Sequence, residues 1–225
     1  RLWDKGLVYR DMKVVPYSWG AATPLSNFEA NQDYRDVEDP SITVAFEVLE
    51  GRGAAEPGDE LLIWTTTPWT LPGNLGVAVA PDVAYVRVNR DGRRMWVAEG
   101  RARAGLGEDL EVDGRSSGAD LLGTTYRPPF EHFESRREEG AFVVIPSADV
   151  TTEDGTGLVH MAPAYGEADY FAFAEAGLRV LIDPIDAEPG LAERLGATAA
   201  GARAALLVPI AESDEGSDSL LVFLS

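Results

Sequence analysis

The run of residues 61–80 constrains the fold most, because it encodes two strands and the sharp bend that joins them. Residues 61–64 are apolar and have strong β-forming character. Three threonines and then Pro68 follow, and proline cannot donate a hydrogen bond to a sheet ladder. Residues 72–74, Pro-Gly-Asn, are typical of a turn, and residues 75–80 are apolar again. The run therefore predicts that hydroxyl groups gather where a buried strand ends.

Two interpretations of these threonines are open at this point. Hydroxyl groups cost free energy to bury unless they are hydrogen-bonded, so their presence at a strand end needs a reason. They belong either to a threonine-rich edge strand with a structural role or to the polar wall of a pocket for a small ligand. The run alone does not decide between them.

Short strands separated by turns make up most of the remaining sequence. The apolar and alternating segments predict further strands at residues 41–50, 83–89, 94–98, 109–115, 141–146, 158–163 and 178–182. Helical segments are few, and they are predicted at residues 1–9, 99–106 and 166–177. This pattern predicts a mainly β chain with small helices, of the α+β type, whose strands form a β-barrel.

Composition excludes several kinds of chemistry. The chain contains no cysteine, so disulfides, thiol nucleophiles and cysteine-based zinc sites are ruled out. Its only histidines are His132 and His160, and we therefore expect neither a metal site nor a cofactor. The net charge of −19 argues against general affinity for nucleic acid. Six arginines between residues 87 and 103 form either a local basic face or ordinary solvated surface. No apolar run approaches the roughly 18–20 residues needed to span a bilayer.

A second polar group lies beyond the strand pairs. Residues 154–160, Asp-Gly-Thr-Gly-Leu-Val-His, place a histidine near a predicted strand end, and Asp169 follows nine residues later in the first turn of a predicted helix. A carboxylate there is stabilised by the helix dipole, so Asp169 is either a first-turn carboxylate or a group poised to hold a cation. His160 is likewise either a hydrogen-bonded core histidine or part of a site.

Taken together, the two motifs resemble the editing domain of isoleucyl-tRNA synthetase. The matching segments are residues 64–74, 154–163, Gly166 and Asp169, with Tyr17 and residues 23–29 upstream. Related valyl and leucyl editing domains typically carry Thr-Thr-Arg-Pro where this chain has Thr-Thr-Thr-Pro-Trp at residues 65–69. The resemblance is therefore specific to the isoleucyl family, and it covers roughly residues 1–185.

The resemblance implies a β-barrel domain with aminoacyl-tRNA hydrolase activity inside an isoleucine--tRNA ligase. Such a domain deacylates misformed valyl-tRNA(Ile) by water attack on the aminoacyl ester. It is needed because one missing methylene is worth only about 1–3 kcal/mol of discrimination, isoleucyl-tRNA synthetase itself being the standard example. The implied partners are the acceptor end of tRNA(Ile) carrying valine and the rest of the synthetase chain, in the cytoplasm and away from any membrane.

Roles for individual residues also follow from the resemblance. The residues given catalytic roles, which hold the α-ammonium group or orient the terminal adenosine and the attacking water, are Asp169, Thr65, Thr66 and Thr67. The residues given substrate-binding roles are His160, whose bulk excludes isoleucine, Asn74 and Trp69. No residue is an obvious general base, so positioning and hydrogen bonding to the oxyanion are expected to be the main catalytic terms.

The sequence departs from the family pattern in two places. Ala168 precedes Asp169 where family members often carry a second acidic residue. Beyond residue 185 the chain no longer aligns, which divides it into an editing-like domain, 1–185, and a divergent tail, 186–225, with a helix-like stretch and a potential β-hairpin. The alternative function is thus a non-catalytic remnant that binds tRNA or a ligand. Motifs for amino-acid activation are absent from the sequence, and we expect no aminoacylation by this chain alone.

Overall fold

The computed structural model describes residues 1–8, 14–18, 23–32, 41–107, 110–182 and 219–222. The chain divides into a small unit, Arg1–Val37, and a large unit, Glu38–Ser225. Within the described residues, no helix combines the length and the apolar character that crossing a membrane requires.

The small unit contains one short hairpin and one short helix. Strand β1 (Tyr17–Ser18) pairs antiparallel with β2 (Thr23–Pro24), and α1 (Asn27–Ala30) follows. A capping box starts α1: the Ser26 hydroxyl accepts from the Glu29 N–H, and the Glu29 carboxylate accepts from the Ser26 N–H at 2.8 Å. Residues 1–8 form exposed turns, so the helix predicted at residues 1–9 is wrong for the described part of that segment. A short, fully exposed segment lacks the packing that stabilises most helices.

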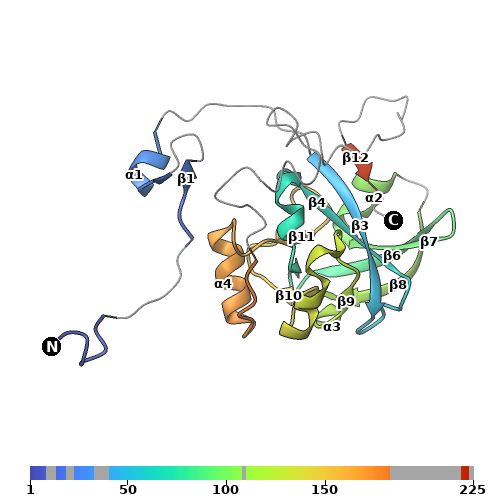
Figure 1. Cartoon of the computed structure of the whole chain (residues 1–225). Coiled ribbons are helices and arrows are strands. Elements are labelled where there is room, and N and C mark those ends of the chain that lie inside the picture. The colour runs from blue at the N-terminus through green and yellow to red at the C-terminus, as the bar shows by residue number, and fades with distance from the viewer. Residues whose placement is uncertain (9–13, 19–22, 33–40, 108–109, 183–218, 223–225) are drawn as a thin grey trace. The chain divides into compact units, whose positions relative to one another are not determined.

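One ten-stranded sheet forms the large unit (Figure 1). Its strands are β3 (Ser41–Glu50), β4 (Glu60–Thr65), β5 (Gly76–Val79), β6 (Ala84–Arg90), β7 (Arg93–Ala98), β8 (Glu111–Ser117), β9 (Thr125–Tyr126), β10 (Val143–Pro146), β11 (Leu158–Met161) and β12 (Ser219–Val222). They follow the order β11-β5-β10-β9-β3-β4-β7-β6-β8, with β12 beside β3. The short helices between them are η1 (Pro68–Gly73), η2 (Glu99–Arg101), α2 (Ala102–Leu106), α3 (Gly118–Leu121), η3 (Glu131–Glu139) and α4 (Glu167–Glu175).

The mixed, sheet-rich architecture confirms the prediction of a mainly β chain with small helices. Among the described residues the ladder path ends at β11 and β8 without joining them, so a closed barrel is not confirmed. The sheet does curl, because β11 lies against β4 although no ladder links the two strands. This curl brings the end of β4 close to β11, and the candidate site forms there.

Register and turn chemistry explain how the strands are fixed. Val44 and Phe46 of β3 lie opposite Ile63 and Leu61 of β4, and all four side chains are buried. The turn between β6 and β7 places Asp91 and Gly92 at φ 53° and 80°, as the Asp-Gly hairpin signal requires. All four residues of β5 are buried between the parallel β10 and the antiparallel β11, which explains its continuous apolar sequence.

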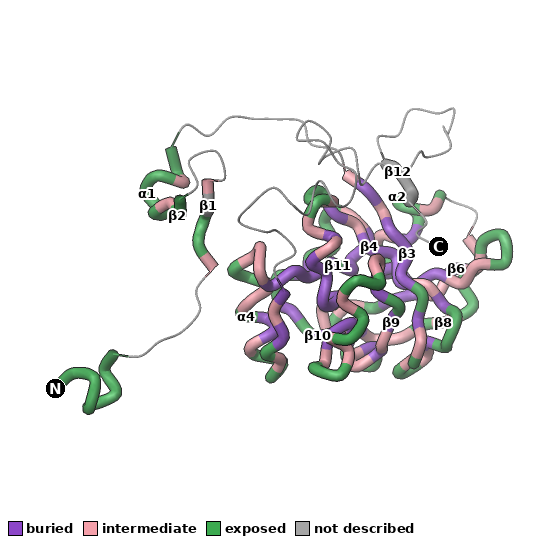
Figure 2. The backbone as a smooth tube through the Cα atoms, viewed as in Figure 1, coloured by how far each residue is buried: buried purple, intermediate pink, exposed green. Residues whose placement is uncertain are grey.

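The main cluster of buried side chains draws on β3, β4, β5, β10 and β11, whose backbone is largely buried in Figure 2, and it includes Phe173 of α4. Phe46 stacks on Tyr126 with ring centroids 5.1 Å apart. The strand predicted at residues 178–182 is wrong: this segment is irregular, and Val180 and Ile182 are buried against the core without joining a ladder. Its alternating pattern reflects this packing.

The described part of the tail is a single strand. β12 pairs in parallel with the first half of β3, and Ser219 lies opposite Ser41 in the register. The helix-like stretch and the first strand of the predicted hairpin lie outside the described residues. The division at residue 185 therefore stays a prediction.

Candidate functional site

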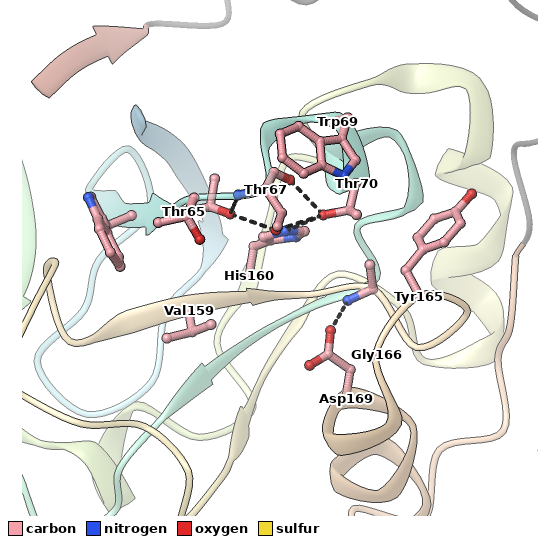
Figure 3. A pocket seen from close by; sticks show the side chains of 12 residues that line it. Thr65, Thr67, Trp69, Thr70, Val159, His160, Tyr165, Gly166 and Asp169 are labelled. Carbon is pink, nitrogen blue, oxygen red and sulfur yellow. Dashed lines mark hydrogen bonds between the residues drawn. The ribbon is translucent and has the colours of Figure 1, made fainter. Parts of the chain in front are cut away.

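A cavity of about 600 Å³ opens where β4 ends, beside β11 and the first turn of α4 (Figure 3). Its walls come from three segments, residues 64–70, 159–162 and 165–169. The predicted site residues that line it are Thr65, Thr66, Thr67, Trp69, His160 and Asp169. The two motifs, about 90 residues apart in the chain, therefore form one site, as the hydrogen bond between Thr70 and His160 also shows.

The threonine wall forms because Pro68 ends the ladder and starts the 3₁₀ helix η1. The Thr65 hydroxyl accepts from the Thr67 backbone N–H at 3.0 Å and lies 3.3 Å from the Thr67 hydroxyl. One turn later, the Thr70 hydroxyl donates to the Thr67 carbonyl at 2.8 Å. Thr65 is 6% exposed, whereas Thr66 and Thr67 are exposed at the cavity. Thr65 thus stabilises the threonine wall by its hydrogen bonds, and the side chains of Thr66 and Thr67 are accessible from the cavity.

His160 is a buried, neutral side chain behind this wall. Its Nε2 lies 2.8 Å from the Thr70 hydroxyl oxygen. The Thr70 hydroxyl donates its one proton to the Thr67 carbonyl, so it accepts a hydrogen bond from His160. The imidazole therefore carries its proton on Nε2. The other nitrogen, Nδ1, is buried without a hydrogen-bond partner among the described residues. Burial lowers the pKa of His160 from 6.5 to about 4, so the ring is uncharged at neutral pH.

Asp169 lies opposite the threonines, in the first turn of α4. Its Oδ2 accepts from the Ala162 backbone N–H at 2.7 Å, which ties the helix start to the end of β11 (Figure 3). A methyl group on Gly166 would lie 3.0 Å from the Asp169 carboxyl carbon, so the absence of a side chain on Gly166 leaves room for the carboxylate next to this backbone. Burial raises the pKa of Asp169 and the negative charge of Asp149 adds to this, while the Ala162 N–H opposes it. The site therefore holds a carboxylate that would gain from a cationic partner.

Asn74 takes a different position. It is 2% exposed and does not line the cavity. Its side chain donates to the Gly76 carbonyl at 2.9 Å and accepts from the Tyr126 hydroxyl at 2.7 Å. This arrangement anchors the end of η1 to the core. The substrate-binding role assigned to Asn74 from the resemblance stays a prediction, without direct contact to the cavity in this structure.

Sequence reasoning did not single out several residues of the site. Thr70 joins the threonine wall to His160, and Val159 and Tyr165 add apolar surface beside the exposed Trp69. The position of Thr70 three residues after Thr67 was the signal for it, since that spacing places both side chains together on a 3₁₀ turn. Tyr165 gave no local signal.

The described residues contain no group of three or more histidine, aspartate or glutamate side chains arranged to hold a metal ion. The cavity instead combines neutral hydroxyl groups, apolar surface and a single carboxylate. Chemically, it suits a small ligand that carries both hydroxyl groups and a cationic amine.

Comparison with known proteins identifies the family. The model for tRNA synthetases of class I (I, L, M and V) matches residues 1–185. The chain belongs to this family. It is 47% identical to the isoleucine--tRNA ligase of Bdellovibrio bacteriovorus and 50% identical to that of Mycobacterium leprae, over 83% of its own length in each case. The resemblance to isoleucyl-tRNA synthetase is thereby confirmed.

The matched part is a small share of these relatives, since the chain spans 18% of the length of each. Among solved structures, the editing domain of the P. falciparum cytosolic leucyl-tRNA synthetase is similar over 59% of this chain and 64% of that domain. The two share 11% sequence identity and superpose with a TM-score of 0.44. That TM-score is too low to establish a shared fold.

Proposed function

We propose that this chain is a hydrolytic proofreading domain that deacylates misformed valyl-tRNA(Ile) by water attack on the aminoacyl ester. The observation that carries the proposal is that exposed threonine hydroxyls and the Asp169 carboxylate lie on opposite sides of one cavity. Membership of the class I tRNA synthetase family supports an aminoacyl-tRNA as the substrate. The curled sheet would correspond to the β-barrel of editing domains.

Asp169 would hold the α-ammonium group of the misattached amino acid. Its Oδ2 is bound to the Ala162 N–H, so Oδ1 is the oxygen that we expect to meet the substrate. Burial raises the pKa of this carboxyl, and an ammonium partner would favour its charged form. A charge-assisted hydrogen bond of this kind is stronger than a neutral one.

The threonine wall would position the ester and the attacking water. Thr66 and Thr67 present neutral hydroxyl groups that both donate and accept, which suits the ribose hydroxyls of a terminal adenosine and a water molecule. His160 is neutral and its Nε2 proton is engaged with Thr70, so it is poorly placed to act as a general base. We therefore assign the catalysis to positioning and oxyanion stabilisation, in which one donor is worth about 10²–10³-fold.

Discrimination would come from the apolar part of the cavity. His160 and Val159 fill the β11 side of the wall. Favourable contacts with one methylene discriminate between two side chains by only about 1–3 kcal/mol. A rigid, buried ring excludes the larger side chain more strongly, because the two would overlap sterically. His160 is packed to 6% exposure, which supports a role as a fixed obstacle to isoleucine.

The partners that we propose are the acceptor end of tRNA(Ile) carrying valine and the remainder of an isoleucine--tRNA ligase in the cytoplasm. To test the function, the whole chain is incubated with valyl-tRNA(Ile) and isoleucyl-tRNA(Ile), and released amino acid is measured. We expect faster release of valine. Equal release of both amino acids would contradict the proposal. tRNA binding without turnover would favour the non-catalytic remnant.

Two variants of the first turn of α4 sharpen this test. Asp169→Asn should lose most of the hydrolysis, because the amide cannot pair with an ammonium group. Glu167→Gln is the matched control: it removes an exposed carboxylate two residues away that does not line the cavity, and it should hydrolyse as the unmodified chain does. Normal turnover by Asp169→Asn would remove the role that we give to this residue.

A further inference from the structure

The turn at residues 153–157, which lies between β10 and β11 in the chain, is held by four hydrogen bonds to its backbone carbonyls. Arg101 donates from Nε to the Gly155 carbonyl and from its Nη1 to the Glu153 carbonyl, both at 2.9 Å. The Ala98 N–H donates to the Thr156 carbonyl at 2.9 Å. The Tyr85 hydroxyl completes the set by donating to the Gly157 carbonyl at 2.8 Å. Groups from β6, β7 and η2 therefore fix the turn.

The same turn packs on Trp64, which lines the cavity. Gly155 has φ +66°, and a methyl group built on it would lie 2.7 Å from Cε3 and 2.9 Å from Cδ2 of Trp64. The bare backbone of Gly155 thus lies directly on the indole. Any movement of this turn changes the support of the Trp64 ring, because no side chain fills the space between them.

Arg101 makes two of the four hydrogen bonds that hold this turn. It lies at the end of η2, and its planar guanidinium spans two carbonyl groups of the turn at once. The chain of contacts runs from Arg101 to the Gly155 backbone, from there to the Trp64 indole, and from the indole to the cavity.

We propose that Arg101 is a positioning residue that clamps the turn at residues 153–157 against Trp64 and so fixes this wall of the cavity. Its effect on catalysis rests on the proposed function, whereas its effect on Trp64 does not. Since displacement of a substrate by about 1 Å can cost up to about 10²-fold in rate, loss of the clamp should lower kcat/KM by about tenfold.

The first test reads the Trp64 ring without any substrate. The chain contains five tryptophans, so labelling with 5-fluorotryptophan gives a small set of ¹⁹F NMR signals, and Trp64→Phe identifies the signal of Trp64. Arg101→Met removes the donors and keeps the apolar stem. Arg115→Met is the matched control, because Arg115 is an exposed arginine that pairs with Glu99 of the same short helix η2. We expect the Trp64 signal to shift or broaden in Arg101→Met alone. An unchanged Trp64 signal in Arg101→Met overturns the proposal.

The second test measures deacylation of valyl-tRNA(Ile) by the whole chain. Arg101→Met should lose about tenfold in kcat/KM. Arg101→Lys can reach one carbonyl, so its kcat/KM should lie between that of Arg101→Met and that of the unmodified chain. In a Trp64→Leu background, Arg101→Met should cause no further loss, because the residue acts through the indole. A role confined to stability would give equal losses in both backgrounds, and that result would refute the proposal.

The two tests also separate this inference from the proposed function. If the unmodified chain hydrolyses no aminoacyl-tRNA while the Trp64 signal moves in Arg101→Met, the hydrolytic function fails and the clamp on Trp64 stands. If hydrolysis is normal in Arg101→Met and the Trp64 signal is unchanged, the clamp fails and the hydrolytic function stands.

Discussion

His160 should contribute to the loss of stability of this chain in acid. The ring is 6% exposed, and burial lowers its pKa from 6.5 to about 4. The unfolded chain therefore takes up a proton on this histidine below about pH 6.5, whereas the folded chain resists protonation down to about pH 4. Stability supplied by the neutral ring is complete above the unfolded pKa and is lost as the pH falls through this window.

The size of the effect follows from the two pKa values. One pKa unit corresponds to about 1.4 kcal/mol, so the interval between 6.5 and about 4 corresponds to about 3 kcal/mol of unfolding free energy. Domains are commonly stable by about 5–15 kcal/mol, so protonation of this one group would remove a large share of the unfolding free energy. The loss should begin below about pH 6.5 and be complete near pH 4.

Urea denaturation followed by tryptophan fluorescence, at constant ionic strength and a series of pH values, measures this effect. The comparison is with His160→Gln, which does not titrate and keeps an N–H donor for Thr70. Other groups titrate in both proteins, so the difference between the two curves isolates the histidine. His132→Gln is the matched control, because His132 is exposed on η3. Parallel curves for His160→Gln and the unmodified chain would refute the reasoning.

Further predictions concern three carboxylates that differ in burial, Asp169, Asp59 and Asp113. Burial raises the pKa of Asp169, so ionisation of this carboxyl lowers the unfolding free energy as the pH rises through the folded pKa. Asp169→Asn should therefore be more stable than the unmodified chain at pH 7, and this gain should vanish in acid. Urea denaturation at both pH values measures the difference. Asp59 is fully buried, accepts from the Trp96 indole N–H at 2.9 Å and pairs with Arg94 at 2.8 Å, so Asp59→Asn should cost about 3 kcal/mol in the same assay. Asp113→Asn, which breaks a partly exposed pair, should cost less than about 1 kcal/mol.

Local patterns in the sequence predicted the strands well, because alternation, turn residues and capping act over short distances. β3 coincides with the predicted segment, and the Asp91-Gly92 turn forms the predicted hairpin. The segment after β4 was predicted as a bend, yet it winds into the 3₁₀ helix η1. Proline and glycine signal where a strand stops, but the path that follows depends on what the segment packs against.

The site was predicted in part, since the resemblance brought both motifs together and the cavity contains six of the seven proposed residues. Asn74 lies outside it because its partner, the Tyr126 hydroxyl, is 52 residues away, and no local pattern encodes such a pairing. The role of Arg101 was equally inaccessible, because its partners are backbone carbonyls of a turn more than 50 residues further along the chain.

The neutrality of His160 connects the stability of the fold with the selectivity of the cavity. Among the described lining residues, Asp169 is the one with a formal charge at neutral pH, provided that His160 stays unprotonated. A charged imidazolium in the same wall would repel an ammonium ligand and offset the attraction of the carboxylate. Burial of the ring keeps its pKa well below neutral, so the cavity presents a net negative charge to a cation. The same burial that makes the chain sensitive to acid thus leaves the cavity with the negative charge that a cationic ligand requires.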